Sequence, residues 1–344
     1  MTSSRRSSEG ELLQSARSGD EQAFAMLMEP YRRELLAHCY RMLGSYADAE
    51  DALQETLLRA WRGVARFEGR SSLRGWLYRI ATNRCLTAIE RRPKRVLPID
   101  YAPAADPHDA LADPVNDPVW LEPFPDLELG LAGPAGPEAR YEQREAVELA
   151  FIAALQNLPA RQRAVLILRD VLGFSARETA DVLEATPVSI DSALQRAHKA
   201  IDDRLPKQSQ QQTLRLLGDE QLSDLVERYL IAWEQNDVHA VVAMLAEDAR
   251  IVMPPLPSWY GGRDDVAMFL HDYALRGHRR WKMVPISANG QPALATYHWD
   301  EQTGAFTRHR ISVLTLRGNE IEEIMAFLDP KLLEPFALPV PRPA

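Results

Sequence analysis

Cysteine is scarce in this sequence of 344 residues, and its placement excludes two classes of protein. The only cysteines are Cys39 and Cys85, and neither belongs to a CxxC pair. Structural zinc sites need closely spaced Cys or His ligands, and disulfide-built secreted domains need a larger even set of cysteines. Both cysteines fall in helical patterns, which predicts small buried side chains in a reducing compartment. We therefore expect no metal and no other cofactor.

Long apolar runs are also missing. No stretch approaches the roughly 20 residues that a membrane-spanning helix needs. The first residues, MTSSRRSSEGELLQ, contain arginine but no apolar segment of the kind found in secretory signals. We expect a cytoplasmic protein without membrane contact. A hydrophobic content of 46% and this chain length allow two or three domains, each with its own core.

The chain has no overall excess of positive charge, but one segment of it is strongly basic. The formal net charge of −9 argues against a protein that coats duplex DNA unaided. Residues 59–95 nevertheless contain eleven Lys and Arg against two Glu, whereas residues 96–138 contain nine Asp and Glu and no Lys or Arg. A basic block beside an acidic one indicates a local surface that binds nucleic acid. The acidic segment is then either a spacer or a nucleic-acid mimic that competes for the basic surface.

Residues 175–201 read as two short helices joined by a tight turn. Ser175 and Glu178 have the spacing of a capping box, and Thr186 followed by Pro187 starts the second helix. The apolar stripe of that helix is Ile190, Leu194, Ala197 and Ile201. The polar face is Asp191, Ser192, Gln195, Arg196 and Lys199. Such a pair is either an ordinary helical hairpin with a solvated face or a DNA-binding helix-turn-helix.

Two further helical faces lie upstream. In DAEDALQETLLRAW, residues 48–61, an acidic and amide surface surrounds Leu58, which suits either docking on another protein's helices or plain solvation. In residues 66–95, Trp76, Arg79 and Asn83 share a helix face at i, i+3 and i+7, with Tyr78 beside them. Basic, aromatic and amide side chains together form a stacking platform for single-stranded bases. Core packing is the alternative for each aromatic side chain.

Taken in this order, these segments resemble the extracytoplasmic-function (ECF) sigma factors of bacterial RNA polymerase. The resemblance implies that residues 48–61 bind the clamp helices of the polymerase β′ subunit, through Asp48, Asp51, Gln54, Glu55 and Leu58. It implies that residues 66–95 melt and read the promoter −10 element, through Phe67, Arg74, Trp76, Tyr78, Arg79 and Asn83. The loop at 67–72 would hold a flipped base. A separate anti-sigma protein is a further partner that the resemblance suggests.

By the same resemblance, the second helix of 175–201 reads the −35 element in duplex DNA. The residues implied are Ser189, Asp191, Ser192, Gln195, Arg196 and Lys199. The chain departs from the family pattern here, because Asp191 and Ala193 stand where family members often carry arginine. Arg196 is then the main guanine reader through its bidentate fork, or equally a phosphate clamp.

The last third of the chain has a different character. Helical patterns at 222–235, 238–246 and 263–275 precede strand-like runs at 281–286, 293–299, 306–316 and 321–327, with Gly and Asn at the intervening turns. This α+β segment resembles the SnoaL-like branch of the nuclear-transport-factor-2-like fold, a conical domain with a pocket. Candidate pocket residues are Trp233, Met253, Trp259, Tyr260, Trp281, His298 and His309.

Three roles for this conical domain stay open at the sequence level. It regulates the sigma regions, it binds a small-molecule ligand, or it catalyses a reaction through Asp248 with His298 or His309. No spacing marks those residues as a catalytic pair, so we expect regulation and no catalytic residue.

The predicted fold class is two all-α sigma domains, a region 2 helical bundle and a region 4 helix-turn-helix, followed by an α+β SnoaL-like domain. The expected boundaries are an N-terminal tail at 1–22, region 2 at 23–95, an acidic proline-rich linker at 96–140, region 4 at 141–205, a second linker at 206–218, the SnoaL-like domain at 219–333 and a proline-rich tail at 334–344.

Overall fold

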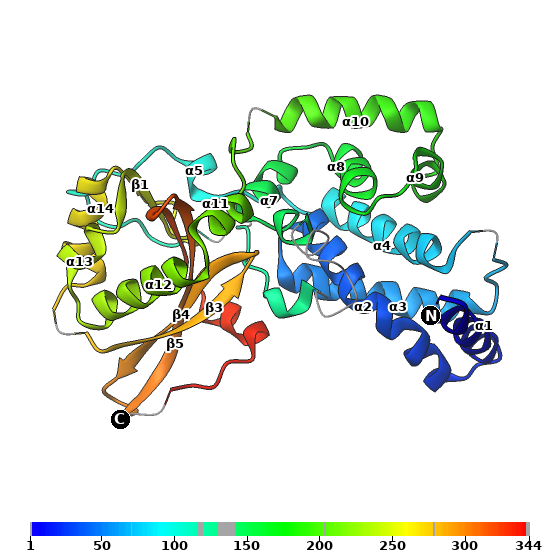
Figure 1. Ribbon diagram of the computed structural model, residues 1–344, viewed down its shortest axis with the longest axis horizontal. Helices are drawn as coiled ribbons and strands as arrows, with labels where there is room; N and C mark the ends of the chain where they lie inside the picture. Colours follow the sequence, from blue (N-terminus) through cyan, green and yellow to red (C-terminus); the bar gives the residue numbers. More distant parts are fainter. Residues whose placement is uncertain are drawn as a thin grey trace. The chain divides into compact units, whose positions relative to one another are not determined.

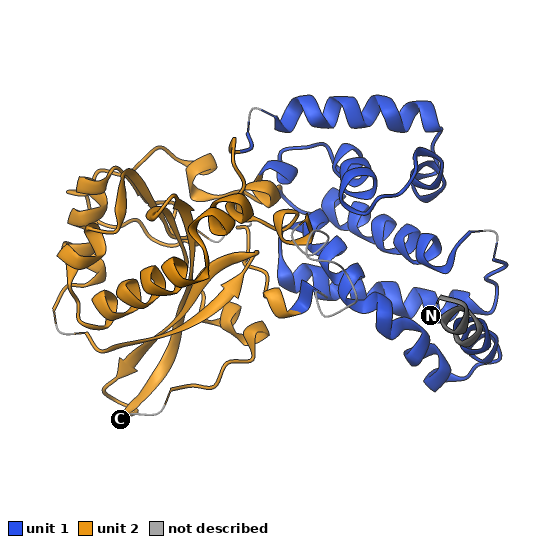
Figure 2. Cartoon of the chain, in the orientation of Figure 1, with its two compact units in different colours: residues 1–93, 128–136, 154–205 blue, residues 94–127, 137–153, 206–344 orange. Residues whose placement is uncertain are grey.

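The computed structural model describes residues 2–69, 71–115, 120–129, 142–202, 204–277 and 279–341. The chain divides into two compact units, coloured separately in Figure 2. Unit 1 contains residues 1–93, 128–136 and 154–205, and unit 2 contains residues 94–127, 137–153 and 206–344. Unit 1 is therefore built from predicted region 2 and most of predicted region 4, whereas the segment between them belongs mostly to the unit that holds the C-terminal third.

The first part of unit 1 is a helical bundle, as the periodicity at 23–92 predicts. Its helices are α1 (Thr2–Arg17), α2 (Glu21–Leu43), α3 (Tyr46–Val64) and α4 (Leu73–Glu90). Side-chain oxygens of Asp20, Ser45 and Ser72 accept backbone N–H groups at the starts of α2, α3 and α4. Helix α2 ends at Leu43, and the next residue, Gly44, has a φ of 68°, the left-handed conformation common after a helix. Helix α1 lies in the stretch that we expected to be a tail.

The second part of unit 1 contains the predicted helix-turn-helix. It is made of α8 (Ala160–Leu166), a π-helical turn (Ile167–Val171), α9 (Ala176–Leu183) and α10 (Pro187–Ile201), shown in Figure 1. Both predicted starts are confirmed: Ser175 and Glu178 form a capping box, and Thr186 caps α10 with Pro187 in its first turn. Of the predicted stripe, Ile190, Ala197 and Ile201 are buried and Leu194 is half-buried.

Unit 2 is built on one six-stranded sheet with the order β2-β1-β6-β5-β4-β3. The strands are β1 (Leu245–Val252), β2 (Trp259–Gly261), β3 (Trp281–Ala288), β4 (Gln291–Asp300), β5 (Ala305–Arg317) and β6 (Glu320–Phe327). Neighbours are antiparallel except β1 and β6, which are parallel. The four predicted strands are confirmed as β3 to β6. Strands β1 and β2 were not predicted, and β1 replaces the end of the helix expected at 238–246.

Helices cover one face of this sheet, where α12 packs on β3 (Figure 1). The helices of unit 2 are α5 (Pro98–Tyr101), α7 (Leu149–Gln156, which crosses into unit 1), α11 (Gln210–Leu217), α12 (Asp219–Glu234), α13 (Val238–Val242) and α14 (Arg263–Phe269). Shorter turns lie at Asp126–Leu129, Leu270–Ala274 and Pro330–Phe336. The core between helices and sheet includes Tyr229, Trp233 and Leu314. The predicted combination of two helical sigma domains with an α+β domain is confirmed.

Residues 94–127, from the predicted linker, and residues 142–153, which begin predicted region 4, are built into unit 2, and we call them together the connecting segment. Residues 128 and 129, between them, belong to unit 1. Trp259 Nε1 donates to the carbonyl oxygen of Ala102 (2.8 Å), and Val115 N–H donates to that of Pro255 (3.0 Å). The Tyr273 hydroxyl donates to the carbonyl oxygen of Asp109 (2.9 Å). Residues 116–119 and 130–140 of the predicted linker lie outside the described residues. Helix α11 occupies most of the second predicted linker.

Within the ranges given above, no helix is long and apolar enough to cross a membrane.

Candidate functional site

The α3 face predicted to bind polymerase is open to solvent. Asp51 and Gln54 are exposed, and the apolar side chain of Leu58 is 50% exposed in their midst. Glu55 accepts a hydrogen bond from Arg59 at 2.6 Å, and this bond lowers the pKa of the Glu55 carboxyl. Asp48 differs from the others, because it is half-buried and ion-paired with Arg92. The face is an apolar centre ringed by carboxylate and amide groups, which suits docking on a basic helical surface.

Three of the residues predicted to read the −10 strand share the accessible face of α4. Asn83 is exposed, and Arg79 is exposed over about half of its side chain. Trp76 is half-buried, with its ring 5.0 Å from that of Phe67 and close to Gly63, where a Cβ would lie 3.1 Å from the indole. The close approach of α3 and α4 at this glycine and the packing on Phe67 hold the Trp76 ring, which is partly accessible.

Two other predicted −10 residues are buried instead. Phe67 is 8% exposed, and Tyr78 is fully buried with its ring 5.1 Å from His38 and 5.2 Å from Phe174. Burial raises the pKa of Tyr78 and lowers the pKa of His38 to about 3, so both are neutral at pH 7. Tyr78 is a core residue here and cannot stack on a base without a rearrangement. Of the loop at 67–72, Arg70 lies outside the described residues.

Residues of the helix-turn-helix half contact two of the predicted −10 residues of α4, Arg79 and Arg74. The Arg79 guanidinium pairs with Glu184 at 2.5 Å, and that of Arg74 lies 4.6 Å from the Phe174 ring centroid. Arg74 also donates to the carbonyl oxygen of Leu172 at 3.4 Å. Helices α4 and α9 lie side by side in Figure 1. Part of the predicted −10 surface is therefore paired with protein groups in the free chain.

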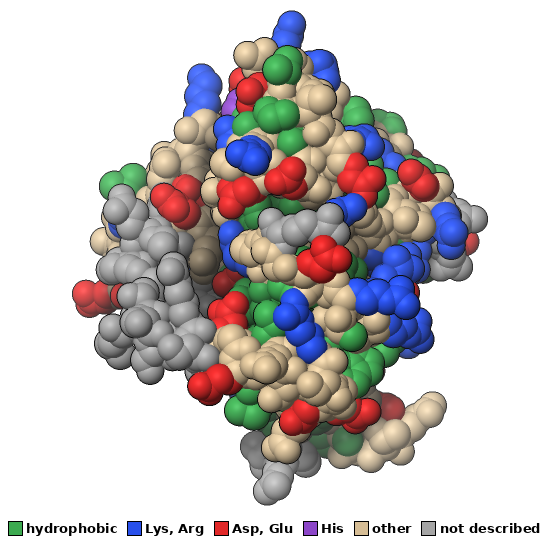
Figure 3. Space-filling model, turned by 90° about the vertical axis from the view of Figure 1, so that its right-hand side faces the viewer, with side chains coloured by type: hydrophobic (Ala, Val, Ile, Leu, Met, Phe, Trp, Pro, Cys, Tyr) green, Lys and Arg blue, Asp and Glu red, His purple; other side chains and the backbone are tan. Residues whose placement is uncertain are grey.

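Nearly all of the residues predicted to read the −35 element lie open on α10. Ser189, Asp191, Gln195, Arg196 and Lys199 are exposed, and Ser192 is half-buried. The hydroxyl of Ser189 is engaged in the cap, where it donates to the carbonyl oxygen of Thr186 (2.8 Å). In the part of the chain that the structure describes, the Arg196 guanidinium has no hydrogen-bond or ion-pair partner. Figure 3 shows basic side chains gathered toward one side of the face it presents, with acidic side chains scattered across it.

Unit 2 contains a cavity of about 160 Å³ between its helices and its sheet. Trp233, Met253, Trp281 and His309 line it, as the sequence indicates. Trp259, Tyr260 and His298 do not line the cavity; the His298 ring packs 5.1 Å from Trp281. Burial, then the charge of Arg310, lowers the pKa of His309 to about 3, so this imidazole is neutral at pH 7.

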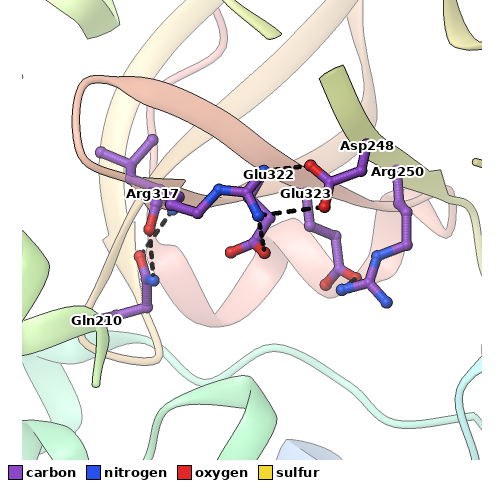
Figure 4. A network of polar contacts seen from close by, with 7 residues as sticks. Gln210, Asp248, Arg250, Arg317, Glu322 and Glu323 are labelled. Carbon is purple, nitrogen blue, oxygen red and sulfur yellow. Dashed lines mark hydrogen bonds and ion pairs between the residues drawn. The ribbon is translucent and has the colours of Figure 1, made fainter. Parts of the chain in front are cut away.

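The structure does not assemble a catalytic pair from Asp248 and the two histidines. Asp248 lies outside the cavity lining and is paired with Arg317, which also reaches Glu322 at 3.4 Å (Figure 4). The hydrogen bond from Arg317 lowers the pKa of the Asp248 carboxyl, so this carboxyl stays charged and does not serve as a proton donor. Among the described residues, no group of His, Cys, Asp and Glu is arranged to hold a metal ion.

One residue that the sequence did not single out joins the connecting segment to the sheet. Asn289, in the turn between β3 and β4, is fully buried and has a φ of 56°. Its side chain accepts from Phe124 N–H (2.8 Å) and donates to the carbonyl oxygen of Val147 (2.7 Å), and its own N–H donates to the carbonyl oxygen of Phe124 (2.9 Å). Asn289 and Gly290 predict a hairpin turn. A sequence pattern does not reveal hydrogen-bond partners of Asn289 that lie so far away along the chain.

Two carboxyls, of half-buried Asp126 and buried Glu148, complete this junction. Asp126 accepts from Gly290 N–H (2.8 Å), and Glu148 accepts from the N–H groups of Gln210 (3.1 Å) and Gln211 (2.8 Å) at the start of α11. Burial outweighs these hydrogen bonds and raises the pKa of Asp126 to about 6 and that of Glu148 to about 7.

Replacing Glu148 by Gln should remove part of the pH dependence of stability. The folded carboxyl binds its proton more tightly than the unfolded one, so its contribution is fully present below pH 4.5 and is lost as pH rises through about 7. At about 1.4 kcal/mol per unit of pKa shift, the free energy of unfolding of E148Q relative to the wild type should rise by roughly 2–3 kcal/mol between pH 4.5 and pH 8. Thermal unfolding at the two pH values measures this, with the exposed Glu142→Gln as control. Parallel pH profiles for E148Q and wild type would contradict it.

Comparison with known proteins agrees with this architecture. Family models match three parts of the chain: sigma-70 region 2 at 27–95, sigma-70 region 4 at 142–201 and a SnoaL-like domain at 226–324. The ECF RNA polymerase sigma factor SigG of Mycobacterium tuberculosis is 42% identical over 325 residues, which cover 94% of this chain and 85% of SigG. The RNA polymerase sigma-H factor of Pseudomonas aeruginosa is 29% identical and matches 57% of this chain and 92% of its own length.

A solved structure shares the fold across most of the chain. The crystal structure of the M. tuberculosis ECF sigma factor SigJ superposes with a TM-score of 0.55 at 20% identity, covering 88% of this chain and 95% of SigJ. The chain is similar to SigG over nearly its whole length, it contains both sigma regions in order, and it shares the SigJ fold. The chain therefore belongs to the family of ECF RNA polymerase sigma factors.

Proposed function

We propose that this sigma factor docks on the β′ clamp helices of core polymerase through the α3 face, reads the melted −10 strand with α4 and reads the −35 duplex with α10. We further propose that unit 2 regulates it by holding the segment that connects the two DNA-reading regions. The observation that carries the regulatory part is the set of hydrogen bonds that builds residues 94–127 and 142–153 into unit 2. The protein acts in the cytoplasm, with polymerase.

In the free chain, part of the −10 surface of unit 1 is occupied by protein groups. Reading the −10 strand with Arg79 requires that Glu184 leave it, and Arg74 must leave Phe174. An exposed ion pair stabilises by about 0–1 kcal/mol, and a cation–π contact by about 0.5–2 kcal/mol. The buried Arg163 adds hydrogen bonds to the carbonyl oxygens of Met42, Gln156 and Leu158. Core polymerase, binding both regions on separate surfaces, supplies the free energy that separates them.

The connecting segment limits how far the two regions separate. A flexible chain of about 60 residues, the length of 94–153, has a root-mean-square span of roughly 40–45 Å. Here residues 94–127 and 142–153 are bound along unit 2, so most of this stretch is held in a folded body and cannot extend as a free chain. If unit 2 releases the segment, the two regions can separate by the span of the free chain. In this way unit 2 controls whether the −10 and −35 elements are recognised simultaneously.

A catalytic role for unit 2 is not favoured by the geometry. The enzyme hypothesis requires a carboxylate beside a cavity histidine, but Asp248 is paired with Arg317 on the surface and His309 faces Arg310. We therefore assign unit 2 a binding and regulatory role without chemistry.

Replacing Arg196 by Ala should test how α10 reads DNA. Loss of a bidentate guanine contact costs about 1–3 kcal/mol and relaxes preference at one base pair of the −35 element. The measurement is in vitro transcription with purified core polymerase on a panel of −35 point variants. Arg177, exposed on α9, is the matched control: Arg177→Ala removes the same charge outside α10 and should leave the −35 preference profile unchanged. If R196A keeps the wild-type preference profile, Arg196 is a phosphate clamp.

A further inference from the structure

A buried cation without a counter-ion lies on the wall of the unit 2 cavity. Arg310 is 5% exposed, and its Nε donates to Ser312 Oγ at 3.2 Å. Its Nη2 is buried and has no hydrogen-bond partner, and no carboxylate of the described residues forms an ion pair with it. The guanidinium lies 4.3 Å from the Trp233 ring centroid and 5.4 Å from that of Trp281. Burying an unpaired charge is costly, and two aromatic faces compensate only part of that cost.

A break in strand register aims this side chain into the cavity. Arg308 is opposite Tyr297 and Arg310 is opposite Thr296, so His309 is the extra residue of a β-bulge in β5. Bulges re-aim side chains, and here two consecutive residues, His309 and Arg310, both line the cavity. Arg308, on the same strand, does not line it.

The other groups that line the cavity also favour binding of an anion. Arg279 is a second cation in the lining, His309 is neutral, and the described lining contains no Asp or Glu. Trp281, on the same wall, has an indole N–H without a partner. Apart from the hydroxyl side chains of Ser312 and Tyr273, the rest of the wall is apolar and includes Met253, Phe269 and Ile324. A cationic end and an apolar body match a molecule with one carboxylate on a compact hydrocarbon frame.

We propose that the cavity of unit 2 binds a small organic carboxylate, with its carboxylate paired to Arg310 and its body against the apolar part of the wall. The volume of about 160 Å³ is close to that of a cavity that accommodates benzene, about 150 Å³, so the ligand is about the size of benzoate. The proposal concerns binding to unit 2 and stands independently of the DNA-reading assignments.

Binding of this ligand is linked to the connecting segment. Leu111 of that segment lines the cavity, and Tyr273, also in the lining, holds the carbonyl oxygen of Asp109. A ligand in the cavity therefore contacts the segment that joins the two sigma regions.

Benzoate and benzamide, which share a shape and differ in charge, test the proposal on the full-length chain by isothermal titration calorimetry and thermal unfolding. We expect wild type to bind benzoate at least tenfold more tightly than benzamide, since a charge-assisted pair is worth about 1.5–3 kcal/mol. Arg310→Met should lose this preference, and without ligand it should unfold at the same or a higher temperature, because a buried unpaired charge is replaced by an apolar side chain. Arg308→Met, which removes the same charge outside the cavity, should keep the preference.

Three results would overturn the proposal: equal affinity of wild type for the acid and the amide, unchanged benzoate binding in R310M, or no benzoate binding at millimolar concentration. Arg310→Gln keeps a hydrogen-bond donor without the charge and replaces R310M if that variant does not fold. Because none of these measurements involves DNA or polymerase, their outcome is separate from that of the transcription experiments.

Discussion

A chain in which Trp76 and Asn83 are both alanine should bind core RNA polymerase normally and fail to open promoter DNA. The two side chains lie on the accessible face of α4, together with Arg79. Stacking of a base on an aromatic side chain is worth about 1–3 kcal/mol, so open-complex formation should fall tenfold or more. Permanganate footprinting of the −10 region reports the melted bases, and co-purification with core polymerase reports binding.

The controls separate strand reading from folding, because Trp76 also packs on Phe67 and beside Gly63. Trp76→Phe keeps an aromatic face and should retain most of the melting. Asn83→Ala alone removes an exposed side chain and should leave thermal stability unchanged. Normal melting by the double variant would show that α4 opens DNA through other residues.

Local signals explain which elements could be predicted. The capping boxes at Ser175 and Thr186 depend only on residues three positions away, and the apolar stripe of α10 follows helical spacing. The antiparallel strands at 281–327 are long and separated by Gly and Asn turns. Strand β2 has three residues, and β1 pairs in parallel with β6, which lies about 75 residues further along the chain, so neither carries a local signature. Helix α11 begins in a polar run that reads equally well as a linker.

The candidate site residues also divide into those that local sequence patterns predict and those that depend on distant contacts. The exposure of Leu58 and of the α10 polar face follows from helical periodicity, which the sequence displays. The burial of Tyr78 depends on Phe174, almost 100 residues away, and no periodicity reports that contact. Arg310 could not be recognised because strict alternation along β5 does not place both His309 and Arg310 on one face; only the bulge does.

Replacing Asn289 by Ala should free the connecting segment and raise transcription severalfold. The variant loses the two side-chain hydrogen bonds to Phe124 N–H and Val147 C=O, and each buried group left unpaired costs about 1–3 kcal/mol. The strands β3 and β4 stay paired over eight residue pairs, so we expect the sheet to persist. In vitro transcription with purified core polymerase gives the activity, and limited proteolysis within residues 102–127 reports release of the segment.

Asn236 offers a matched control for backbone strain. It has the same φ of 56° and hydrogen-bonds to Arg279 instead of the connecting segment, so Asn236→Ala carries the same left-handed strain without loosening residues 94–127. Increased proteolysis in N289A without a change in transcription would separate segment release from activity and contradict regulation by unit 2. A point variant is more informative than deletion of 206–344, because deletion also strips Phe124 and Leu149 of their partners in the sheet and exposes an apolar surface. A rise in transcription confined to N289A would therefore be caused by the length of free chain between the −10 and −35 readers.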